Sequence, residues 1–409
     1  MTISFDAILK NAKKLQGIVI KTPLIYSRAL SDRAGTETYL KCENLQRAGS
    51  FKIRGAYTRI SKLSDKEKSQ GVVAASAGNH AQGVALAAQM LGIKATIYMP
   101  DAASIPKVIA TEGYGAEVRF YGKTVDEALE EARRFSDETG AVLIHPFDHE
   151  DIVMGQASCG LEILKSLPDV DTIIVGVGGG GLLAGIALVA HEHFLKTGHK
   201  IKLIGVQAKE AAAYPESLKK HEIIKLKKMS TMADGIAIAQ PGKVPFHIIE
   251  QYVDEFVTVS EEYLAQAIVF LAERCKVVAE PAGAATVAAI LEKKIKPQGK
   301  TVAVLSGGNI DPTLLSRVIT HGLAESGRHL YFGVVIKDNP GSLSALTKDI
   351  ADLGASVEDI SHRRNHRLGM EVGQVEIDFK VETRGDKHNE EILAQLEKLG
   401  YQLVSSEIL

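Results

Sequence analysis

The sequence predicts an α/β protein with mostly parallel sheets, followed by a smaller domain with the order βαββαβ. Two observations carry this prediction. From about Gly71 to Leu305, short apolar runs alternate with segments of helical periodicity, which is the pattern of parallel sheets covered by helices. Beyond about Gly327, apolar and polar residues alternate within the strands, as they do in half-exposed antiparallel strands. A chain of 409 residues has room for two or three domains.

The elements of the first part follow one another in regular alternation. Strands are predicted where short apolar runs are bounded by turn residues, at 71–75, 94–99, 117–121, 141–144, 172–175, 201–206, 252–259 and 301–305. Helices are predicted where apolar residues recur every three or four positions, at 1–16, 79–91, 104–112, 125–139, 153–167, 181–194, 261–275 and 281–291. The section 209–245 is less regular and is predicted to be rich in loops.

The second part changes from buried strands to half-exposed ones. Its predicted elements are strand 328–336, helix 342–353, strands 355–363 and 370–381, helix 386–399 and strand 401–404. Asp338-Asn339-Pro340-Gly341 is a turn sequence, and Gly354 and Gly400 end the two helices. This order is the ferredoxin-like plan, and about 80 residues are enough for a separate small domain.

Composition and charge exclude several classes of function. The chain is 45% hydrophobic and 24% charged, which is typical of a soluble globular protein. A net charge of -2 without a basic run disfavours nucleic acid and acidic membranes as partners. Cys42, Cys159 and Cys275 lie far apart, so neither a disulfide framework nor a zinc site is expected. The first residues indicate an amphipathic helix and not a signal peptide, and we expect a cytoplasmic protein.

Glycine is enriched, with 37 residues, and four of them stand together. Gly178, Gly179, Gly180 and Gly181, with Leu182, follow the strand 172–175 and open the helix 181–194. Backbone N–H groups in such a loop, together with the positive end of the helix dipole, bind anions such as phosphate. Four consecutive glycines cost too much conformational entropy for a plain turn, so we predict a phosphate loop.

Three of these positions also match a dinucleotide-binding motif. Gly176, Gly178 and Gly181 have the spacing G-x-G-x-x-G. That fold needs an acidic residue at the end of the next strand to hold a ribose, and the strand 201–206 is followed by Gln207. NAD binding is therefore disfavoured.

A lysine stands in an apolar context in the segment Ser50-Phe51-Lys52-Ile53-Arg54-Gly55-Ala56. If its ammonium group is desolvated there, the pKa of Lys52 falls and its amine becomes a nucleophile toward carbonyls. A single lysine is more often a solvated surface charge, so the motif alone leaves both interpretations open.

Two further motifs follow predicted strands. Ser76-Ala77-Gly78-Asn79-His80 lies at a strand-to-helix corner and suits recognition of a carboxylate, although Asn79 could equally be a helix cap. His80 has no partner at metal-ligand spacing and is not predicted to bind a metal. Ser306-Gly307-Gly308-Asn309 follows the strand 301–305 and, taken alone, could be an ordinary turn.

Taken in order, the four motifs resemble those of the serine/threonine dehydratases, which are pyridoxal-phosphate enzymes of the tryptophan-synthase-β type. The resemblance spans about residues 5–320 and implies a two-lobed catalytic domain, 1–325, with a smaller lobe at about 41–145 inserted in the larger lobe. The C-terminal part, with Asp338-Asn339-Pro340-Gly341-Ser342-Leu343 after a strand, resembles an ACT domain, a module that binds amino acids. This domain would span residues 328–409.

The resemblance implies a role for each motif. Lys52 would hold pyridoxal 5'-phosphate covalently and would be the catalytic base that removes the substrate's α-proton. Phe51 would lie against the cofactor ring, Asn79 would donate to its phenolic oxygen, and Ser306 would face its pyridine nitrogen. The residues that would hold the cofactor phosphate are Gly178, Gly179, Gly180, Gly181 and Leu182. Those that would bind the substrate are Ser76, Ala77, Gly78, Asn79 and His80.

The implied activity is conversion of L-threonine to 2-oxobutanoate and ammonia, with L-serine to pyruvate as a side activity. Two alternatives remain: a serine racemase or another enzyme of β-elimination or β-replacement, and a non-catalytic amino-acid sensor. Ala77 stands where the racemases carry a serine, which disfavours racemisation, and Lys52 argues against a sensor. The carboxylates that bind a divalent metal in those racemases correspond here to Gln207 and Ala213, so no such metal site is expected. Binding of a monovalent cation by backbone carbonyls stays open as a possibility.

The C-terminal resemblance implies regulation. Because threonine deamination leads toward isoleucine, isoleucine or valine is the expected effector, and allosteric feedback is the expected response. ACT domains often pair with each other, so we expect a homodimer or a homotetramer.

Overall fold

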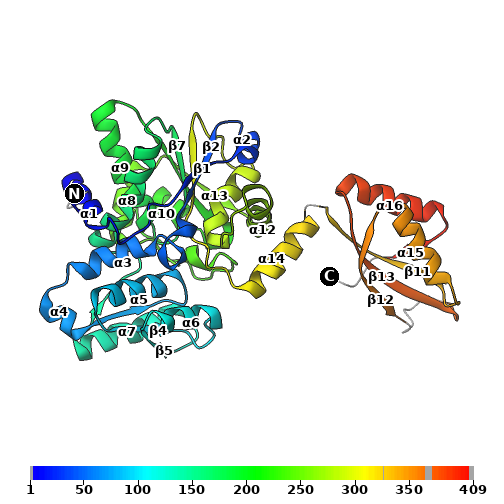
Figure 1. Cartoon of the computed structure of the whole chain (residues 1–409), viewed down its shortest axis with the longest axis horizontal. Helices are drawn as coiled ribbons and strands as arrows, with labels where there is room; N and C mark the ends of the chain where they lie inside the picture. Colours follow the sequence, from blue (N-terminus) through cyan, green and yellow to red (C-terminus); the bar gives the residue numbers. More distant parts are fainter. Residues whose placement is uncertain (1–2, 326, 364–370, 405–409) are drawn as a thin grey trace. The chain divides into compact units, whose positions relative to one another are not determined.

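The computed structural model describes residues 3–325, 327–363 and 371–404. Met1 and Met370, where we predicted a helix and a strand to begin, lie outside these residues. The chain divides into two compact units, Met1–Leu315 and Ser316–Leu409. The predicted domain boundary at 325–328 lies further along the chain, at the end of α14 (Pro312–Glu325; Figure 1).

The first unit contains two sheets, and the larger has the strand order β1-β2-β10-β7-β8-β9. Its strands are β1 (Leu24–Tyr26), β2 (Thr38–Cys42), β7 (Thr172–Gly176), β8 (Lys202–Ala208), β9 (Glu255–Val259) and β10 (Thr301–Leu305). β1 runs antiparallel to β2, and the other neighbours are parallel. Every residue of β7 and β10 is buried, as expected for a sheet with both faces covered. The predicted α/β fold with mostly parallel sheets is confirmed.

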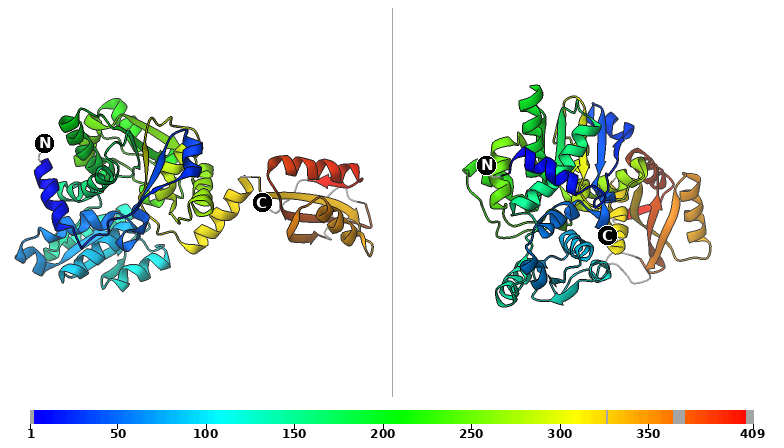
Figure 2. Two further views of the ribbon diagram at one scale, coloured as in Figure 1. Left: turned by 45° about the horizontal axis from the view of Figure 1, so that its top comes forward. Right: turned by 60° about the vertical axis from the view of Figure 1, so that its left-hand side comes forward.

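Helices cover both faces of this sheet (Figures 1 and 2). On one face, α8 and α9 pack against each other, with α1 and α11 beside them; on the other, α13 packs against β7 and β10, with α12 and α2 beside it. The bounds are α1 (Phe5–Lys14), α2 (Arg28–Ala34), α8 (Glu150–Ser166), α9 (Gly181–Thr197), α10 (Ala213–Lys220), α11 (Lys243–Tyr252), α12 (Glu261–Phe270) and α13 (Pro281–Leu291).

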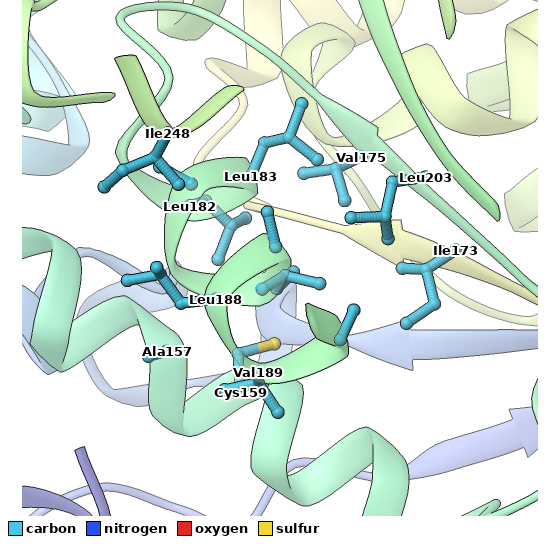
Figure 3. Packing of buried hydrophobic residues seen from close by; sticks show 14 of the residues in the cluster. Ala157, Cys159, Ile173, Val175, Leu182, Leu183, Leu188, Val189, Leu203 and Ile248 are labelled. Carbon is cyan, nitrogen blue, oxygen red and sulfur yellow. The ribbon is translucent and has the colours of Figure 1, made fainter. Parts of the chain in front are cut away.

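The buried core beneath α9 fixes the position of this helix and of the glycine-rich turn before it. Ile173 and Val175 of β7 and Leu203 of β8 join one buried cluster with Leu182 and Leu183, in the first turn of α9 (Figure 3). Burying an aliphatic side chain of this size contributes about 2 kcal/mol, so the start of the helix is held firmly against the sheet. The glycine loop between β7 and α9 therefore has a defined position.

The smaller sheet has the order β5-β4-β3-β6 and is parallel throughout (Figure 1, blue and cyan). Its strands are β3 (Val72–Ala75), β4 (Ala95–Met99), β5 (Glu117–Phe120) and β6 (Val142–Leu143). Its helices are α3 (Lys52–Ser61), α4 (Asp65–Gln70), α5 (Asn79–Leu91), α6 (Ile105–Gly113) and α7 (Val125–Thr139). α7 has its predicted bounds because its signals are local: Thr124 caps its start, and Gly140 turns left-handed at its end, with φ 76°.

The structure also contains elements that periodicity did not predict. Up to residue 70 these are β1, α2, β2, α3 and α4; later ones are α10, which lies in the section predicted to be rich in loops, α11 and α14. Because β2 pairs with β10, residues 41 and 42 belong to the larger sheet, although we predicted them in the smaller lobe. The predicted helix 261–275 ends at Phe270, and a π-helical turn, η5 (Leu271–Cys275), follows it. Short 3₁₀ turns complete the unit: η1 (Glu43–Leu45), η2 (Arg47–Gly49), η3 (Lys209–Ala211) and η4 (Asp234–Ile236).

Beyond α14, the described residues of the second unit form an antiparallel sheet with two helices, in the predicted order βαββαβ. Its elements are β11 (His329–Lys337), α15 (Ser342–Asp352), β12 (Ser356–Arg363), β13 (Gln374–Glu382), α16 (Asp386–Lys398) and β14 (Gln402–Val404). The strand order is β12-β13-β11-β14. Alternate residues of β13, such as Ile377 and Phe379, pack with Leu346 and Ile392 of the helices in a separate core.

Two further findings concern the whole chain. Within the ranges described above, no helix is long and apolar enough to cross a bilayer. Cys42, Cys159 and Cys275 are free thiols.

Candidate active site

Lys52 is the first residue of α3, a helix held between two others. A Cβ built on Gly83 of α5 would lie 3.0 Å from Cβ of Lys52, so that helix crosses the start of α3 at close range. On the other side, a Cβ on Gly155 of α8 would collide with the backbone carbonyl of Arg54. Glycine at both crossings permits these short separations, and the backbone of Lys52 is fixed from two sides.

The amine of Lys52 lies among weak partners. Its Nζ donates to the carbonyl of Pro146 at 3.2 Å and lies 5.0 Å from the centre of the Phe51 ring. Burial lowers the pKa of Lys52 from 10.5 to about 8, and the negative charge of Glu280 only partly opposes the change. About one amine in ten is therefore neutral, and nucleophilic, at pH 7.

The loop after β10 joins the lysine segment through the backbone. The Phe51 N–H donates to the carbonyl of Ser306 at 3.2 Å, and Ser50 and Gly307 form an isolated antiparallel bridge. The hydroxyl of Ser306 is buried and has only a long contact of 3.5 Å, to the carbonyl of Ala282. Two motifs about 250 positions apart in the sequence thus form one surface, on which this hydroxyl is still able to donate or accept a stronger hydrogen bond.

Asn79 is the first residue of α5 and is not its cap, since Gly78 occupies the cap position. Its side-chain Nδ2 donates to Oε1 of Glu280 at 2.6 Å. Its Oδ1 accepts from Nδ2 of Asn309 at 2.8 Å. The structure therefore connects the loop before α5 with the loop after β10, and it adds a residue, Glu280, that we did not predict.

Glu280 is a buried carboxyl group, 2% exposed, at the residue before α13. Burial, reinforced by the negative charge of Asp234, raises the pKa of Glu280 from 4.5 to about 7. A Cβ on Gly307 would collide with its Oε1, so a side chain there would displace the carboxyl from its place beside the Ser306 loop. In the sequence, Glu280 is an acid before Pro281 and an alanine-rich helix, which indicates a helix cap. That pattern does not predict that its carboxyl lies beside Asn79.

The corner from Ser76 to His80 lies at the carboxyl end of β3. Oγ of Ser76 accepts from the N–H of Gly78 at 3.1 Å, which leaves the hydroxyl hydrogen of Ser76 for another acceptor. Ala77 and Gly78 are half-buried beside it. His80 is turned away, because its Nε2–H donates to the carbonyl of Ile144 at 2.7 Å, and burial together with the charge of Lys52 lowers its pKa to about 3. His80 is thus a neutral residue of the scaffold.

The glycine loop lies between β7 and α9, as predicted. The first bond inside α9 runs from the N–H of Ala184 to the carbonyl of Gly180, so the N–H groups of Gly181 and Leu182 have no partner within the helix. Gly180 has a φ of 98°, which side chains rarely adopt, and a Cβ there would collide with the Tyr214 hydroxyl. The loop therefore offers backbone N–H groups at the start of a helix of 17 residues, a place where an anion is favoured.

Close packing brings the glycine loop to the other motifs. A Cβ on Gly179 would collide with the ring of Phe147, whose neighbour Pro146 accepts the hydrogen bond from Lys52. A Cβ on Gly178 would lie 3.1 Å from Cα of Ile236, and one on the adjacent Gly235 would lie 3.5 Å from Oε1 of Glu280. The glycine loop, the lysine and the Asn79 corner thus surround one site.

The structure also shows what Gln207 does. Its Nε2 donates to the carbonyl of Val177 at 3.1 Å, and its Oε1 accepts from the N–H of Tyr214 at 2.9 Å. The side chain thus connects the residue before the glycine loop to the start of α10. Among the residues that the structure describes, no group of three or more His, Cys, Asp or Glu side chains could hold a metal ion.

Comparisons with known proteins agree with this arrangement. The family described as pyridoxal-phosphate dependent enzyme matches residues 15–307. The L-threonine ammonia-lyase of Thermotoga maritima is 45% identical over 402 residues, covering 98% of this chain and 99% of that protein. Among solved structures, the processed form of threonine deaminase isoform 2 from Solanum lycopersicum is 36% identical with a TM-score of 0.71, and the alignment covers 78% of this chain and 89% of that one. Maize serine racemase is 33% identical with a TM-score of 0.73, with 79% and 99% covered.

Proposed function

The chain belongs to the pyridoxal-phosphate-dependent enzymes, and within this family we propose that it is an L-threonine ammonia-lyase. It converts L-threonine to 2-oxobutanoate and ammonia, with L-serine to pyruvate as a side activity. The observation that carries this proposal is the 45% identity to a relative of that name over 98% of the chain, which includes the second unit as well as the first. The site supplies the groups that this chemistry needs.

The residues of the site fit pyridoxal phosphate. The N–H groups at the start of α9, in a loop too tight for side chains, suit its phosphate, and the Lys52 amine of lowered pKa suits its aldehyde. Asn79 has a second hydrogen on Nδ2 for the phenolic oxygen, and the Ser306 hydroxyl has only its long contact and suits the pyridine nitrogen. Phe51 lies 5.0 Å from the lysine amine and suits the ring.

The protein's own groups then divide the work of elimination. Pyridoxal phosphate, when bound, stabilises negative charge at the substrate's α-carbon. Lys52 is the base that removes the α-proton, and burial keeps enough of its amine neutral for this task. The hydroxyl of Ser76 and the N–H groups at the start of α5 bind the substrate carboxylate at the positive end of that helix.

Ser306 is expected to favour elimination over transamination. A neutral hydroxyl stabilises a positive charge on the pyridine nitrogen less than a carboxylate would, so the cofactor withdraws electrons only modestly and prompt elimination is favoured. Ser306→Asp is expected to lower lyase activity and to raise transamination, measured as amino-group transfer to the cofactor. A variant with unchanged lyase activity and no side reaction would contradict this role.

One assay tests the proposed activity against its alternative. The similarity to maize serine racemase makes racemisation the second candidate, but Ala77 at the substrate corner carries no proton to deliver to the other face. We expect 2-oxoacid from L-threonine, less from L-serine, and no interconversion of L- and D-serine. Lys52→Ala is the control for the background rate, and D-serine formed from L-serine would favour the racemase.

We further propose that the second unit is an ACT domain that binds isoleucine or valine and lowers lyase activity, as feedback in isoleucine biosynthesis. Support comes from its βαββαβ order and from the turn Asp338–Gly341 between β11 and α15, where Gly341 has a φ of 92°. Threonine saturation curves with and without isoleucine and valine test this, and unchanged curves would refute it. Sedimentation should show a homodimer or a homotetramer.

A further inference from the structure

The side-chain amide of Asn79 is hydrogen-bonded through both its nitrogen and its oxygen. Its Nδ2 donates to Glu280 at 2.6 Å, and its Oδ1 accepts from Nδ2 of Asn309 at 2.8 Å. Both distances are typical of well-formed hydrogen bonds. An asparagine side chain can be turned over by half a rotation, which exchanges its oxygen and nitrogen, so the partners decide which atom faces where.

The partners of Asn309 settle that orientation without ambiguity. Nδ2 of Asn309 also donates, at 2.7 Å, to the backbone carbonyl of Ala48, which can only accept. The end of Asn309 that reaches Asn79 is therefore its nitrogen, and Asn79 must present its oxygen there. The nitrogen of Asn79 then faces Glu280, which has to accept.

Glu280 is well placed to be the fixed end of this series of hydrogen bonds. It occupies the cap position of α13, and its side chain makes no capping bond to that helix. The carboxyl is instead enclosed by Gly307 and Gly235, at neither of which a Cβ would fit without close contact. The charged groups that act on it are Asp234, Lys107 and Lys52, from η4, α6 and α3.

We propose that Glu280 is a positioning residue that acts through Asn79. The hydrogen bonds from Asn309 to Asn79 and from Asn79 to Glu280 lock the Asn79 amide with its nitrogen on the Glu280 side. The second hydrogen on that nitrogen is thereby available to a cofactor oxygen, and the Asn79 oxygen is kept away from it. The inference rests on the cofactor assignment in the proposed function, but it does not depend on which amino acid is the substrate.

A double-mutant cycle on cofactor affinity tests the proposal. Asn79→Ala, Glu280→Ala and the double variant are compared by titrating cofactor-free protein with pyridoxal phosphate and following the visible absorbance of the bound form. Each single variant is expected to bind about tenfold more weakly, the equivalent of one hydrogen bond. If Glu280 acts through Asn79, the double variant binds within about threefold of Asn79→Ala. A loss near a hundredfold, the product of the two, would overturn the proposal.

Two further variants keep the test decisive. Glu280→Gln retains an accepting oxygen, so it is expected to bind the cofactor within about threefold of wild type; a loss as large as that of Glu280→Ala would show that charge matters, not orientation. Glu292→Ala is the matched control at the other end of α13, where Glu292 accepts from the N–H of Ser260 at 3.2 Å. It should leave cofactor affinity unchanged. Circular dichroism of each cofactor-free variant confirms that it is folded.

The cycle also separates this inference from the proposed function. Wild-type protein that binds the cofactor but does not act on L-threonine would refute the proposed substrate and leave the cycle readable. Wild-type activity on L-threonine together with multiplying effects in the cycle would refute the role of Glu280 alone.

Discussion

The first turn of α3 carries two cationic side chains two positions apart, and they sit in opposite electrostatic settings. Arg54 belongs to an anchor cluster that consists of Lys41, Glu43, Arg54 and Glu162. Its guanidinium donates to Glu43 at 2.7 and 2.8 Å and to Glu162 at 2.8 and 3.0 Å. Lys52 belongs to a reactive cluster of Lys52, Asn79 and Glu280, in which its amine donates only to a backbone carbonyl.

The two clusters respond to burial in opposite ways. Burial disfavours the charge of Arg54, but Glu43 more than offsets it, so the pKa of Arg54 rises well above its ordinary value. Burial likewise disfavours the charge of Glu43, yet Arg54 holds its pKa below the ordinary range. In the reactive cluster burial dominates, lowering the pKa of Lys52 to about 8 and raising that of Glu280 to about 7. Contact with an opposite charge, and not burial alone, separates a structural ion from a reactive one.

The largest effect is expected at the reactive lysine. Lys52→Ala removes the proposed covalent attachment of the cofactor and the proposed base, and should lower the turnover of L-threonine by about 10⁴-fold. Lys52→Arg is the matched control, because it keeps a cation of similar length but cannot supply a neutral amine at neutral pH. Both variants should fold, as judged by circular dichroism. Lyase activity within tenfold of wild type in either variant would contradict the assignment.

The next effect is on stability and belongs to the anchor cluster. Arg54→Met leaves Glu43 buried without its main counter-charge and should lower the free energy of unfolding by about 4 kcal/mol. Urea denaturation followed by circular dichroism measures this, because the chain has no tryptophan to report by fluorescence. The transition of the first unit is identified by its shift with cofactor. Arg54→Lys should recover part of the loss; an unchanged midpoint in Arg54→Met would show that the cluster is no anchor.

The sequence predicts those parts of the site whose residues are close together in the chain, and it does not predict those that depend on distant partners. The glycine loop is predictable because Gly178 to Gly181 are contiguous and follow a buried strand. α3 is not, because buried Arg54 interrupts its apolar face and Gly55 lowers its helix propensity. Glu280 is not predictable either, since its partner Asn79 lies 201 positions away.

The same distinction explains the fold. The alternation of strands and helices from residue 71 onward appears in the sequence because each element carries its own periodicity and its own caps. The strand order does not appear there: β10 lies between β2 and β7, and no local pattern reports such a pairing. β1 was missed because it has three residues, two of them exposed, which is too short for a period to be recognised. Topology and side-chain partners are properties of the folded chain.

The buried glutamates of the two clusters, Glu280 and Glu43, should give opposite pH dependences. Glu280 has a folded pKa of about 7 against 4.5 when unfolded, so the folded state binds more protons between these values, and the contribution of Glu280 to stability falls as pH rises. Stability of wild type minus that of Glu280→Gln should therefore decrease by about 3 kcal/mol from pH 4.5 to 7.

Glu43→Gln is the matched comparison for the opposite sign. The pKa of Glu43 is lowered, so its contribution to stability is present above the ordinary pKa of a glutamate and is lost as the solution becomes more acidic. Stability of wild type minus that of Glu43→Gln should accordingly decrease on acidification below that value. If the two stability differences changed with pH in the same direction, the division into an anchor and a reactive cluster would be contradicted.

The smallest effect is expected where an ion pair is exposed, and it isolates the part that burial plays. Lys202 and Glu255 pair at 2.6 Å between β8 and β9, closer than most contacts of the anchor cluster, but their side chains are 33% and 36% exposed. Water already solvates both charges, so Glu255→Gln should change the free energy of unfolding by about 0.5 kcal/mol or less, measured as for Arg54→Met. A loss comparable to that of Arg54→Met would mean that pairing distance alone sets the energy. The near absence of an effect would show that an opposite charge becomes essential only where the protein has removed the water.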